Sequence, residues 1–594
     1  MSHDESLEKD LFDLNTSSMR SGVWCLLDAL SSCLMVTNGG KPSTISLGQA
    51  VSSSQIDAAF LTLSLDKIRS LLTSDDVPSE RMLELGSTAR DCLKVISKMG
   101  SFVPIDEARS CFVNLLNDLK SFNLSIELVS SGIGALVALT KRQCEEEDAT
   151  REVKEEVADW VRDCLSSCER AIDTCVTSFA QQGMMSQENE KLLSRVLFSV
   201  GELVLVGFSS QEDSSKMGKD DVESTDCHPV RGLVIRPAAR LVHLVKLMLP
   251  RRLPVPNKSS DVDPTPTPSA VRAHGYIAIG KLSLRDESLA KDSLNILARE
   301  LHHDSNADPA VMSNALMIMG DLCVRYTNLV DKYLPYLAGC LQAGDGKPDQ
   351  VSGASVSRLS LTFCRQSANP YSIVKKNAVL LLASLLLQDY IKWRGLFIHR
   401  FLAAVADPDD EVSCLASTAL RGPLLEKQPA LFSNHFVGAV FVFNLCSAHP
   451  LYQAEASSGG GMSIGFNTSL SGEVGAPRRK EIYDFMLSNM SDEQKLAVTA
   501  RLCKEVLGGA LETSGDLSVV CNLPAGEAQS TKSSLSTSRI VAATNVLTDT
   551  LAILTSSQIK VGRKGSNGAD DLASSSRSEQ RSAHKQKLLS KISR

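Results

Sequence analysis

Three cysteines, Cys164, Cys168 and Cys175, stand at spacings of i, i+4 and i+11, which would align their thiols along one face of a helix. Thiolates in such an arrangement can bind zinc. A structural zinc site takes four ligands, however, and the sequence offers no fourth candidate nearby. The alternative is burial as small apolar side chains, which is common for free cysteine. This second interpretation is favoured, and we predict no metal here.

A local group of histidine and aspartate is formed by His302, His303, Asp304 and Asp308. Both residue types can bind metal ions. The group falls at a turn between two expected helices, where these residue types are ordinary surface residues. A metal site is therefore the less favoured interpretation here as well.

Several motifs that define enzyme families are missing from the sequence. It holds no HExxH motif, no Walker A loop and no protein-kinase set. The glycine-rich stretch 457–461 resembles a phosphate-binding loop only superficially, because no expected strand precedes it and no Gly-Lys-Ser/Thr occurs. We predict a non-catalytic protein with no cofactor and no small-molecule substrate. An enzyme with a dispersed site is the least favoured alternative.

The stretch 231–258 carries seven lysines and arginines and no acidic residue, in a chain whose net charge is −7. Contact with nucleic acid must come from such a local patch. A helix is expected here, with Pro237 in its first turn. Its cations either bind phosphates or, as is favoured, form an exposed face paired with acidic neighbours. The candidate nucleic-acid residues are Arg236, Arg240, Lys246, Arg251 and Arg252.

Three other sites carry positive charge. The cluster 478–480 (RRK) is either a nuclear-import signal or the polar start of a helix at 482–490. Trp393 stands between two cations and could serve binding, although packing between repeats is favoured. The tail 556–594 has nine basic and three acidic residues and is predicted to be disordered. Import, non-specific DNA binding and solubility are all open roles for this tail.

Two threonine-proline dipeptides, at Thr265 and Thr267, lie in the Pro-rich stretch 259–269, which we expect to be a flexible, non-helical linker. Such dipeptides are minimal proline-directed phosphorylation sites. A phosphate on either threonine would add up to about two negative charges.

Length and composition favour a helical array. The chain has 594 residues, 43% of them apolar and 5% aromatic, which is too long for one core and suits helix-on-helix packing. Its sixteen cysteines include no CxxC pair, which is typical of a reducing compartment. The acidic, polar first residues are not a signal peptide, and no apolar run reaches the ~20 residues that cross a bilayer. We expect a soluble intracellular protein.

An internal repeat is the strongest pattern in the chain. Four times, a proline is followed within a few residues by a valine that begins an expected helix. The valines are 40, 63 and 38 residues apart, so the middle interval is one repeat plus about 23 residues, assigned to an inserted loop at 343–369. The four pairs are Pro268 and Val271, Pro309 and Val311, Pro370 and Val374, and Pro408 and Val412.

Two helices can be recognised in each repeat. A period near 40 with two helices and a proline corner is typical of HEAT repeats, whose helix pairs bury their apolar stripes by stacking into a solenoid. The stretch 320–341 is expected to join two repeats, with its corner at Thr327-Asn328. Helices are expected at 273–284, 289–301, 313–326, 329–341, 376–387, 391–405 and 414–425.

The predicted fold is therefore an all-α HEAT-repeat α-solenoid with flexible loops and a disordered basic tail. Five segments are expected: an N-terminal helical-repeat region at 1–210, a basic helix with flanking loops and the Pro-rich linker at 211–269, the HEAT-repeat core at 270–450, a Gly/Ser-rich loop with C-terminal helices at 451–555, and the tail at 556–594.

Three stretches, 271–301, 320–342 and 380–412, resemble the D-type HEAT subunits of condensin. The residues at Tyr326, at 331–333 (DKY) and at 392–393 (KW) are more similar to those of the condensin II subunit than to those of its condensin I counterpart. Family members are much longer, so the chain resembles a part of such a subunit. Met312 and Ser413 stand where the family usually has a basic residue, as at Arg272 and Lys375.

The resemblance implies a non-catalytic scaffold in the nucleus, on chromosomes. Its implied partners are the kleisin subunit, the SMC ATPase pair and a second HEAT subunit of condensin, together with chromatin DNA and histones. Its implied role is mitotic chromosome condensation in the cell cycle and cell division, with no membrane partner. The alternative is a HEAT-repeat adaptor of another complex, such as a transport receptor or a phosphatase scaffold.

Overall fold

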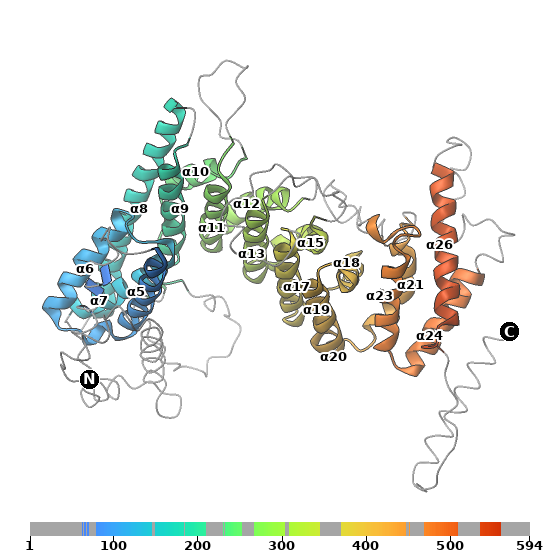
Figure 1. Ribbon diagram of the computed structural model, residues 1–594. Coiled ribbons are helices and arrows are strands. Elements are labelled where there is room, and N and C mark those ends of the chain that lie inside the picture. The colour runs from blue at the N-terminus through green and yellow to red at the C-terminus, as the bar shows by residue number, and fades with distance from the viewer. Residues whose placement is uncertain are drawn as a thin grey trace, which may run out of the picture. The chain divides into compact units, whose positions relative to one another are not determined.

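The computed structural model describes residues 79–144, 149–182, 185–208, 232–251, 266–302, 308–344, 370–446, 468–508 and 535–559, with a few single residues besides. All regular structure in these ranges is helical, without a strand, so the predicted all-α HEAT-repeat fold is confirmed (Figure 1). The glycine run 457–461 and the tail beyond residue 559 lie outside the described ranges. None of the described helices is both long enough and apolar enough to span a membrane.

The chain divides into two units, Met1–Leu297 and Ala298–Arg594, with the boundary inside helix α12. The predicted five segments are a finer division and stay a prediction. The described parts of the first unit are helical in the N-terminal region, at the basic stretch and at the start of the predicted HEAT-repeat core. The helices are α5 (Ser79–Met99), α6 (Ile105–Lys120), α7 (Ile126–Gln143), α8 (Ala149–Gln182), α9 (Gln187–Val204), α10 (Ala239–Leu247), α11 (Ser269–Arg285) and α12 (Glu287–Glu300).

The second unit continues the pattern of stacked helix pairs, with short 3-10 and π turns at several helix ends. Its helices are α13 (Pro309–Arg325), α14 (Thr327–Val330), α15 (Leu334–Gly339), α17 (Ser372–Leu387), α18 (Phe397–Ala403), α19 (Asp410–Ala419), α20 (Leu425–Lys427), α21 (Leu431–Phe443), α23 (Ala476–Ser488), α24 (Asp492–Leu502) and α26 (Leu535–Thr555). Figure 1 shows α13, α17 and α19 side by side.

All four proline-valine pairs mark helix starts, as predicted. Helices α11, α13, α17 and α19 begin between the proline and the valine or at the proline itself. The four valines are fully buried, because each lies in a first turn that packs onto a neighbouring helix. Asp308 and Asp409 cap α13 and α19 by accepting hydrogen bonds from backbone N–H groups of the first turn.

In three of the four repeats, the residue after the valine ties its repeat to a neighbouring corner. Arg272 is buried, and its Nε donates to the carbonyl of Leu249 at 3.0 Å. Lys375 is also buried and lies 2.7 Å from the Asp407 carboxylate. Ser413, one of the two departures from the family pattern, donates instead to the carbonyl of Val405.

The junction at 320–341 differs from the prediction. Thr327 and Asn328 already belong to α14, and the turn is made by Tyr326, whose φ of −133° and ψ of 59° are not helical. The helix expected at 329–341 is broken into α14, a 3-10 turn at Asp331–Tyr333 and α15. Pro335 explains the break, because it has no N–H to bond the preceding turn.

Smaller boundary differences concern the prolines near α10 and α11. Helix α10 begins at Ala239, so Pro237 lies just outside its first turn. Ser269, expected in a non-helical linker, is the first residue of α11, with Pro268 as its N-cap residue. Proline fixes a φ compatible with helix entry, which suits it to this position.

The inserted loop leaves and rejoins the array at one point. Gly344 has a φ of +77°, and a Cβ placed there would meet side-chain carbons of Tyr371 at 2.8–3.1 Å. The chain before the insertion therefore touches the chain after it. Residues 345–369 lie outside the described ranges.

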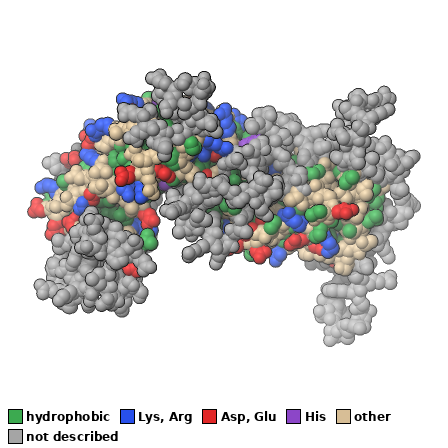
Figure 2. Space-filling model, turned by 45° about the horizontal axis from the view of Figure 1, so that its top comes forward, with side chains coloured by type: hydrophobic (Ala, Val, Ile, Leu, Met, Phe, Trp, Pro, Cys, Tyr) green, Lys and Arg blue, Asp and Glu red, His purple; other side chains and the backbone are tan. Residues whose placement is uncertain are grey.

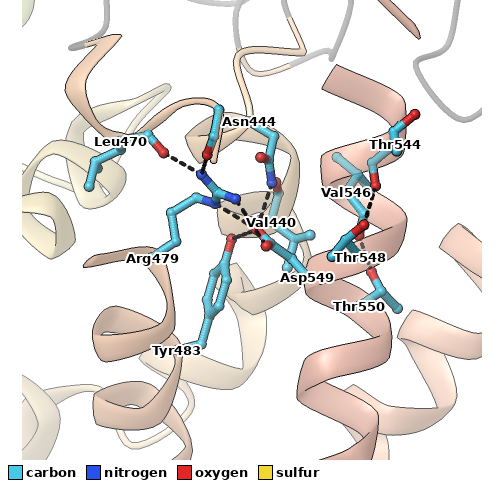
Figure 3. Close-up of polar contacts among 11 residues, drawn as sticks. Val440, Asn444, Leu470, Arg479, Tyr483, Thr544, Val546, Thr548, Asp549 and Thr550 are labelled. Atoms are coloured by element: carbon cyan, nitrogen blue, oxygen red, sulfur yellow. Dashed lines mark hydrogen bonds and ion pairs between the residues drawn. The ribbon is translucent and has the colours of Figure 1, made fainter. Parts of the chain in front are cut away.

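A buried polar cluster holds the last described helix, α26, onto the second unit (Figure 3). Arg479 binds both oxygens of Asp549, with Nε to Oδ2 at 2.7 Å and Nη2 to Oδ1 at 3.0 Å. Tyr483 and Asn444 donate to the same carboxylate at 3.1 and 2.9 Å. Its surroundings raise the pKa of Tyr483 well above the usual value, first through burial and then through the Asp549 charge.

This cluster corrects one interpretation of the basic run 478–480. Arg479 is buried, and Arg478 donates from Nε to the carbonyl of Ala406 at 2.8 Å. Only Lys480 is exposed, and it pairs with Asp484 at 2.7 Å. The run is the start of α23, as the other interpretation held, and it does not present three exposed cations to an import receptor.

We predict that Asp549→Ala costs about 3–5 kcal/mol in the docking of α26, because it leaves the buried Arg479 charge unpaired. Hydrogen exchange of the α26 amides in the full chain measures this. The double variant Arg479→Met with Asp549→Leu should restore much of the protection. Thr548→Ala, which removes an exposed hydroxyl from the same helix, is the control. Equal protection in Asp549→Ala and the control would contradict the prediction.

We also predict that replacing residues 345–369 by two or three glycines leaves the neighbouring repeats stacked, because Gly344 already contacts Tyr371. Thermal unfolding of the deletion variant should match that of the parent chain. The Tyr371→Ala variant of the deletion should be less stable, since it removes the contact that closes the junction. Loss of helical content in the simple deletion would show that the insertion supports the fold.

Candidate functional site

The metal-binding candidates are placed as core and capping residues. Cys164, Cys168 and Cys175 are all buried on α8, and burial raises the pKa of the Cys164 thiol to about 12. Asp308 is used as the cap of α13, while His303 and Asp304 lie outside the described residues. Within the described ranges, no group of three or more His, Cys, Asp or Glu side chains is arranged to hold a metal ion.

One catalytic pattern is present at 461–465, where GMSIG matches G-x-S-x-G. A nucleophile at such a motif needs a strand before it and a helix after it. The motif lies outside the described residues, and the described ranges contain no strand. The match therefore supports no catalytic role.

The predicted basic residues lie on and beside α10 in the first unit. Arg240 is 62% exposed, but its guanidinium lies 2.9 Å from Asp173 and 3.6 Å from Glu169, both on α8. Lys246 lies 3.6 Å from Asp292 of α12. For these two residues the structure shows the ion pairs with acidic neighbours that were expected if the basic face does not bind phosphate.

The remaining basic candidates are Arg236 and Arg251, which are both exposed, and Arg252, which lies outside the described residues. Exposed ion pairs such as those of Arg240 are worth only about 0–1 kcal/mol, so a phosphate could replace the carboxylates at little cost. Contact between this helix and nucleic acid therefore stays a prediction.

Of the two predicted phosphorylation sites, Thr265 lies outside the described residues. Thr267 is described, and it is buried rather than part of an open linker. Its N–H donates to the carbonyl of Arg251 at 2.9 Å. Modification at either position stays a prediction.

Trp393 packs within its own repeat. Its ring centroid lies 4.8 Å from that of Phe397 and 5.8 Å from that of Phe401, both on α18. The favoured packing role is therefore found, but between a corner and its following helix rather than between repeats. The flanking Arg394 pairs with the Asp331 carboxylate of the preceding corner at 2.5 Å.

An exposed surface that the sequence did not predict crosses α13, α17 and α19 in the second unit; we call it the B-helix face. Helices α13 and α17 each contribute three exposed side chains at i, i+4 and i+7, which is one stripe of a helix. Helix α19 contributes two, and the third, Arg421, lies in the π turn Leu420–Leu424 that follows it. The stripes are Met317, Asp321 and Val324; Leu380, Ser384 and Leu387; and Cys414, Thr418 and Arg421.

The stripes lie in register because the three helices run parallel. Asn377 of α17 donates to Ser313 of α13 at 2.6 Å, and a turn further on Gly320 approaches Leu381. A Cβ at Gly320 would lie 2.5 Å from a Leu381 methyl group, so glycine permits this close packing. Lys376 of α17 and Glu411 of α19 form an ion pair that sets the next register.

The centre of the B-helix face is apolar. Leu380 is 55% exposed, and Met317, Val324 and Leu387 are exposed beside it. Charge appears only toward the two sides, at Asp321 and Arg421. Exposed apolar residues gathered on one face are typical of a surface that binds a protein partner.

A sequence signal for this face does exist. Helix α17 reads SIVKKNAVLLLASLLL and is apolar almost all round. A helix of that kind must either be buried on every side or leave an apolar stripe exposed. Sequence periodicity cannot choose between these outcomes, because the choice depends on which neighbours cover the helix.

These features define a class of protein: a HEAT-type helical scaffold whose described residues present helix faces rather than a catalytic centre. Within this class, residues 235–301 match the HEAT-repeat family of condensin-2 complex subunit D3-like proteins. Residues 356–508 match the family of non-SMC mitotic condensation complex subunit 1.

Individual relatives agree with these family matches. Condensin-2 complex subunit D3-L of Xenopus laevis is 27% identical over 450 residues, which cover 75% of this chain and 26% of the relative. Condensin-2 complex subunit D3 of Mus musculus is 27% identical over 410 residues, covering 66% and 23%. Condensin-2 complex subunit CAP-D3 of Arabidopsis thaliana is 24% identical over 470 residues, covering 73% and 31%.

The predicted resemblance is thereby confirmed: the chain is similar to the D-type HEAT-repeat subunits of condensin, and to the condensin II subunit D3 in particular. The chain spans between 23% and 31% of the length of these three relatives.

Proposed function

We propose that this protein is a non-catalytic scaffold subunit of a condensin II-like complex and that the B-helix face binds a segment of the kleisin subunit. The observation that carries the proposal is the row of exposed apolar side chains on α13 and α17. Similarity to condensin-2 subunit D3 supports the choice of complex. In such a complex the protein acts in the nucleus, on mitotic chromosomes, beside the SMC ATPase pair and a second HEAT subunit.

The geometry suits a peptide better than a globular partner. Apolar positions recur on parallel helices, so a bound segment can place its own apolar residues across successive repeats. A HEAT array exposes such a surface along its length. The near absence of charge at the centre of the face favours an apolar or amphipathic segment.

We predict that Leu380→Asp combined with Leu387→Asp lowers the affinity for purified kleisin by about tenfold or more, because each change places a charge in the apolar contact. Isothermal titration or interferometry with the full chain measures the affinity. Val474→Asp is the matched control, since Val474 is 93% exposed in the same unit but lies off the B-helix face. Thermal unfolding should be unchanged in both.

Equal kleisin affinity in the double variant and the parent would contradict binding through this face. Recovery from mitotic cells tests the wider proposal. Capture of SMC and kleisin subunits with the tagged chain is expected. Their absence, with capture of transport or phosphatase subunits instead, would favour the alternative of a HEAT adaptor of another complex.

A second proposed contact is between the basic residues of α10 and the DNA of chromatin, including nucleosomal DNA wrapped on histones. It is supported by the exposed Arg236, Arg240 and Arg251 and by the basic stretch that holds them. Because Arg240 lies against Glu169 and Asp173, the carboxylates both hold and weaken it as a phosphate ligand.

We predict that Glu169→Gln with Asp173→Asn raises DNA affinity about threefold to tenfold at low salt, since both changes release Arg240 to phosphate. Fluorescence anisotropy with duplex DNA over a range of salt concentrations measures it. Glu152→Gln with Glu155→Gln changes the charge equally on exposed positions of the same helix and is the control.

Adding Arg240→Ala to the first variant should remove the gain and lower the salt slope by about one. If the control variant gains as much affinity as the first, the effect is one of net charge, and Arg240 does not contact DNA.

A further inference from the structure

The contact between α10 and α11 is closed by three interactions at the end of α10. The Thr267 N–H donates to the carbonyl of Arg251, and Arg272 Nε donates to the carbonyl of Leu249. Gly275 lets α11 approach closely, since a Cβ there would lie 3.2 Å from a Leu249 methyl group. Thr267 is the outermost of these links and stands one residue before the Pro268 N-cap of α11.

The Thr267 side chain is poorly satisfied in this position. Thr267 is 6% exposed, and its hydroxyl oxygen is buried without a hydrogen-bond partner. The buried hydroxyls of Thr140 and Thr550, in contrast, each donate to a backbone carbonyl one helical turn back. A buried polar group without a partner favours any state in which water can reach it. The backbone hydrogen bond therefore keeps Thr267 buried, although its hydroxyl would be more stable in contact with water.

We propose that Thr267 is a concealed phosphorylation site whose modification by a proline-directed kinase opens the contact between α10 and α11. Local opening breaks the hydrogen bond from the Thr267 N–H to the Arg251 carbonyl and frays the first turn of α11, and it gives the hydroxyl access to water. Pro268 then supplies the residue that this kinase class selects after the acceptor.

The chemical step is an ordinary phosphoryl transfer from ATP. Thr267 Oγ forms a bond to the γ-phosphorus, the bond from that phosphorus to the bridging oxygen breaks, and ADP leaves. The hydroxyl proton passes to the catalytic base of the kinase. The product carries up to about two negative charges, which cannot return to a site that buries the unmodified hydroxyl. Phosphorylation therefore holds the segment open.

The experiment uses the full chain with Thr265→Ala, so that Thr267 is the only phosphate acceptor of the two neighbouring dipeptides. A recombinant cyclin-dependent kinase and Mg-ATP are added, the sites are mapped by mass spectrometry, and exchange of the Thr267 amide is followed. We expect a phosphate on Thr267 and an amide exchange about tenfold faster after modification. A free peptide of residues 260–275 serves as the positive control for the kinase.

A second variant separates this mechanism from a purely structural role. Thr267→Val keeps the shape and removes the unsatisfied hydroxyl, so the amide should exchange about tenfold more slowly than in the parent. A structural threonine with a needed hydroxyl would give faster exchange. Phosphorylation of the peptide but never of the folded chain, unchanged exchange after modification, or faster exchange in Thr267→Val would each overturn the proposal.

Discussion

Backbone carbonyls at the ends of helices need hydrogen-bond donors, and this requirement shapes both units. Each repeat corner ends a helix and leaves its last carbonyls without partners in that helix. Long basic side chains from a neighbouring element supply the donors. Arg195 reaches the carbonyl of Phe122, Arg285 reaches those of Val206 and Leu233, and Lys427 reaches those of Leu386 and Leu387. The stacking of repeats is thus fixed by cations as well as by apolar burial.

The same requirement explains why basic residues were hard to interpret from sequence. A run of arginines indicates positive charge but not whether that charge faces solvent. Arg479 donates hydrogen bonds to Asp549 and to two corner carbonyls, those of Leu470 and Gly472. Removing one partner of such a buried pair is costly, whereas the intact pair adds little net stability and chiefly fixes one arrangement. Arg479 therefore orients α23 against α26 rather than serving as a binding residue.

Sequence periodicity predicted the repeats well because their starts are local. A proline, a capping residue and an apolar first turn lie within five residues, so Val271, Val311, Val374 and Val412 could be read directly. The polar cluster at Asp549 could not, because Asn444 and Arg479 lie 105 and 70 residues away along the chain. The break at Pro335 was local but was outweighed by the apolar pattern around it. The B-helix face depended on which helices cover α17, which no local pattern records.

Stacking also decides what is left for partners. Charged side chains at the corners form ion pairs with neighbouring elements, as Asp331 does with Arg394 and Asp389 with Lys427. The exposed sides of α13 and α17 instead carry the apolar residues Met317, Val324, Leu380 and Leu387. An exposed ion pair at a corner can exchange its partner at little cost in free energy. Exposed apolar surface, in contrast, is stabilised only when a partner covers it and removes it from water. The B-helix face is therefore where a partner gains most, and the corners are where its register is set.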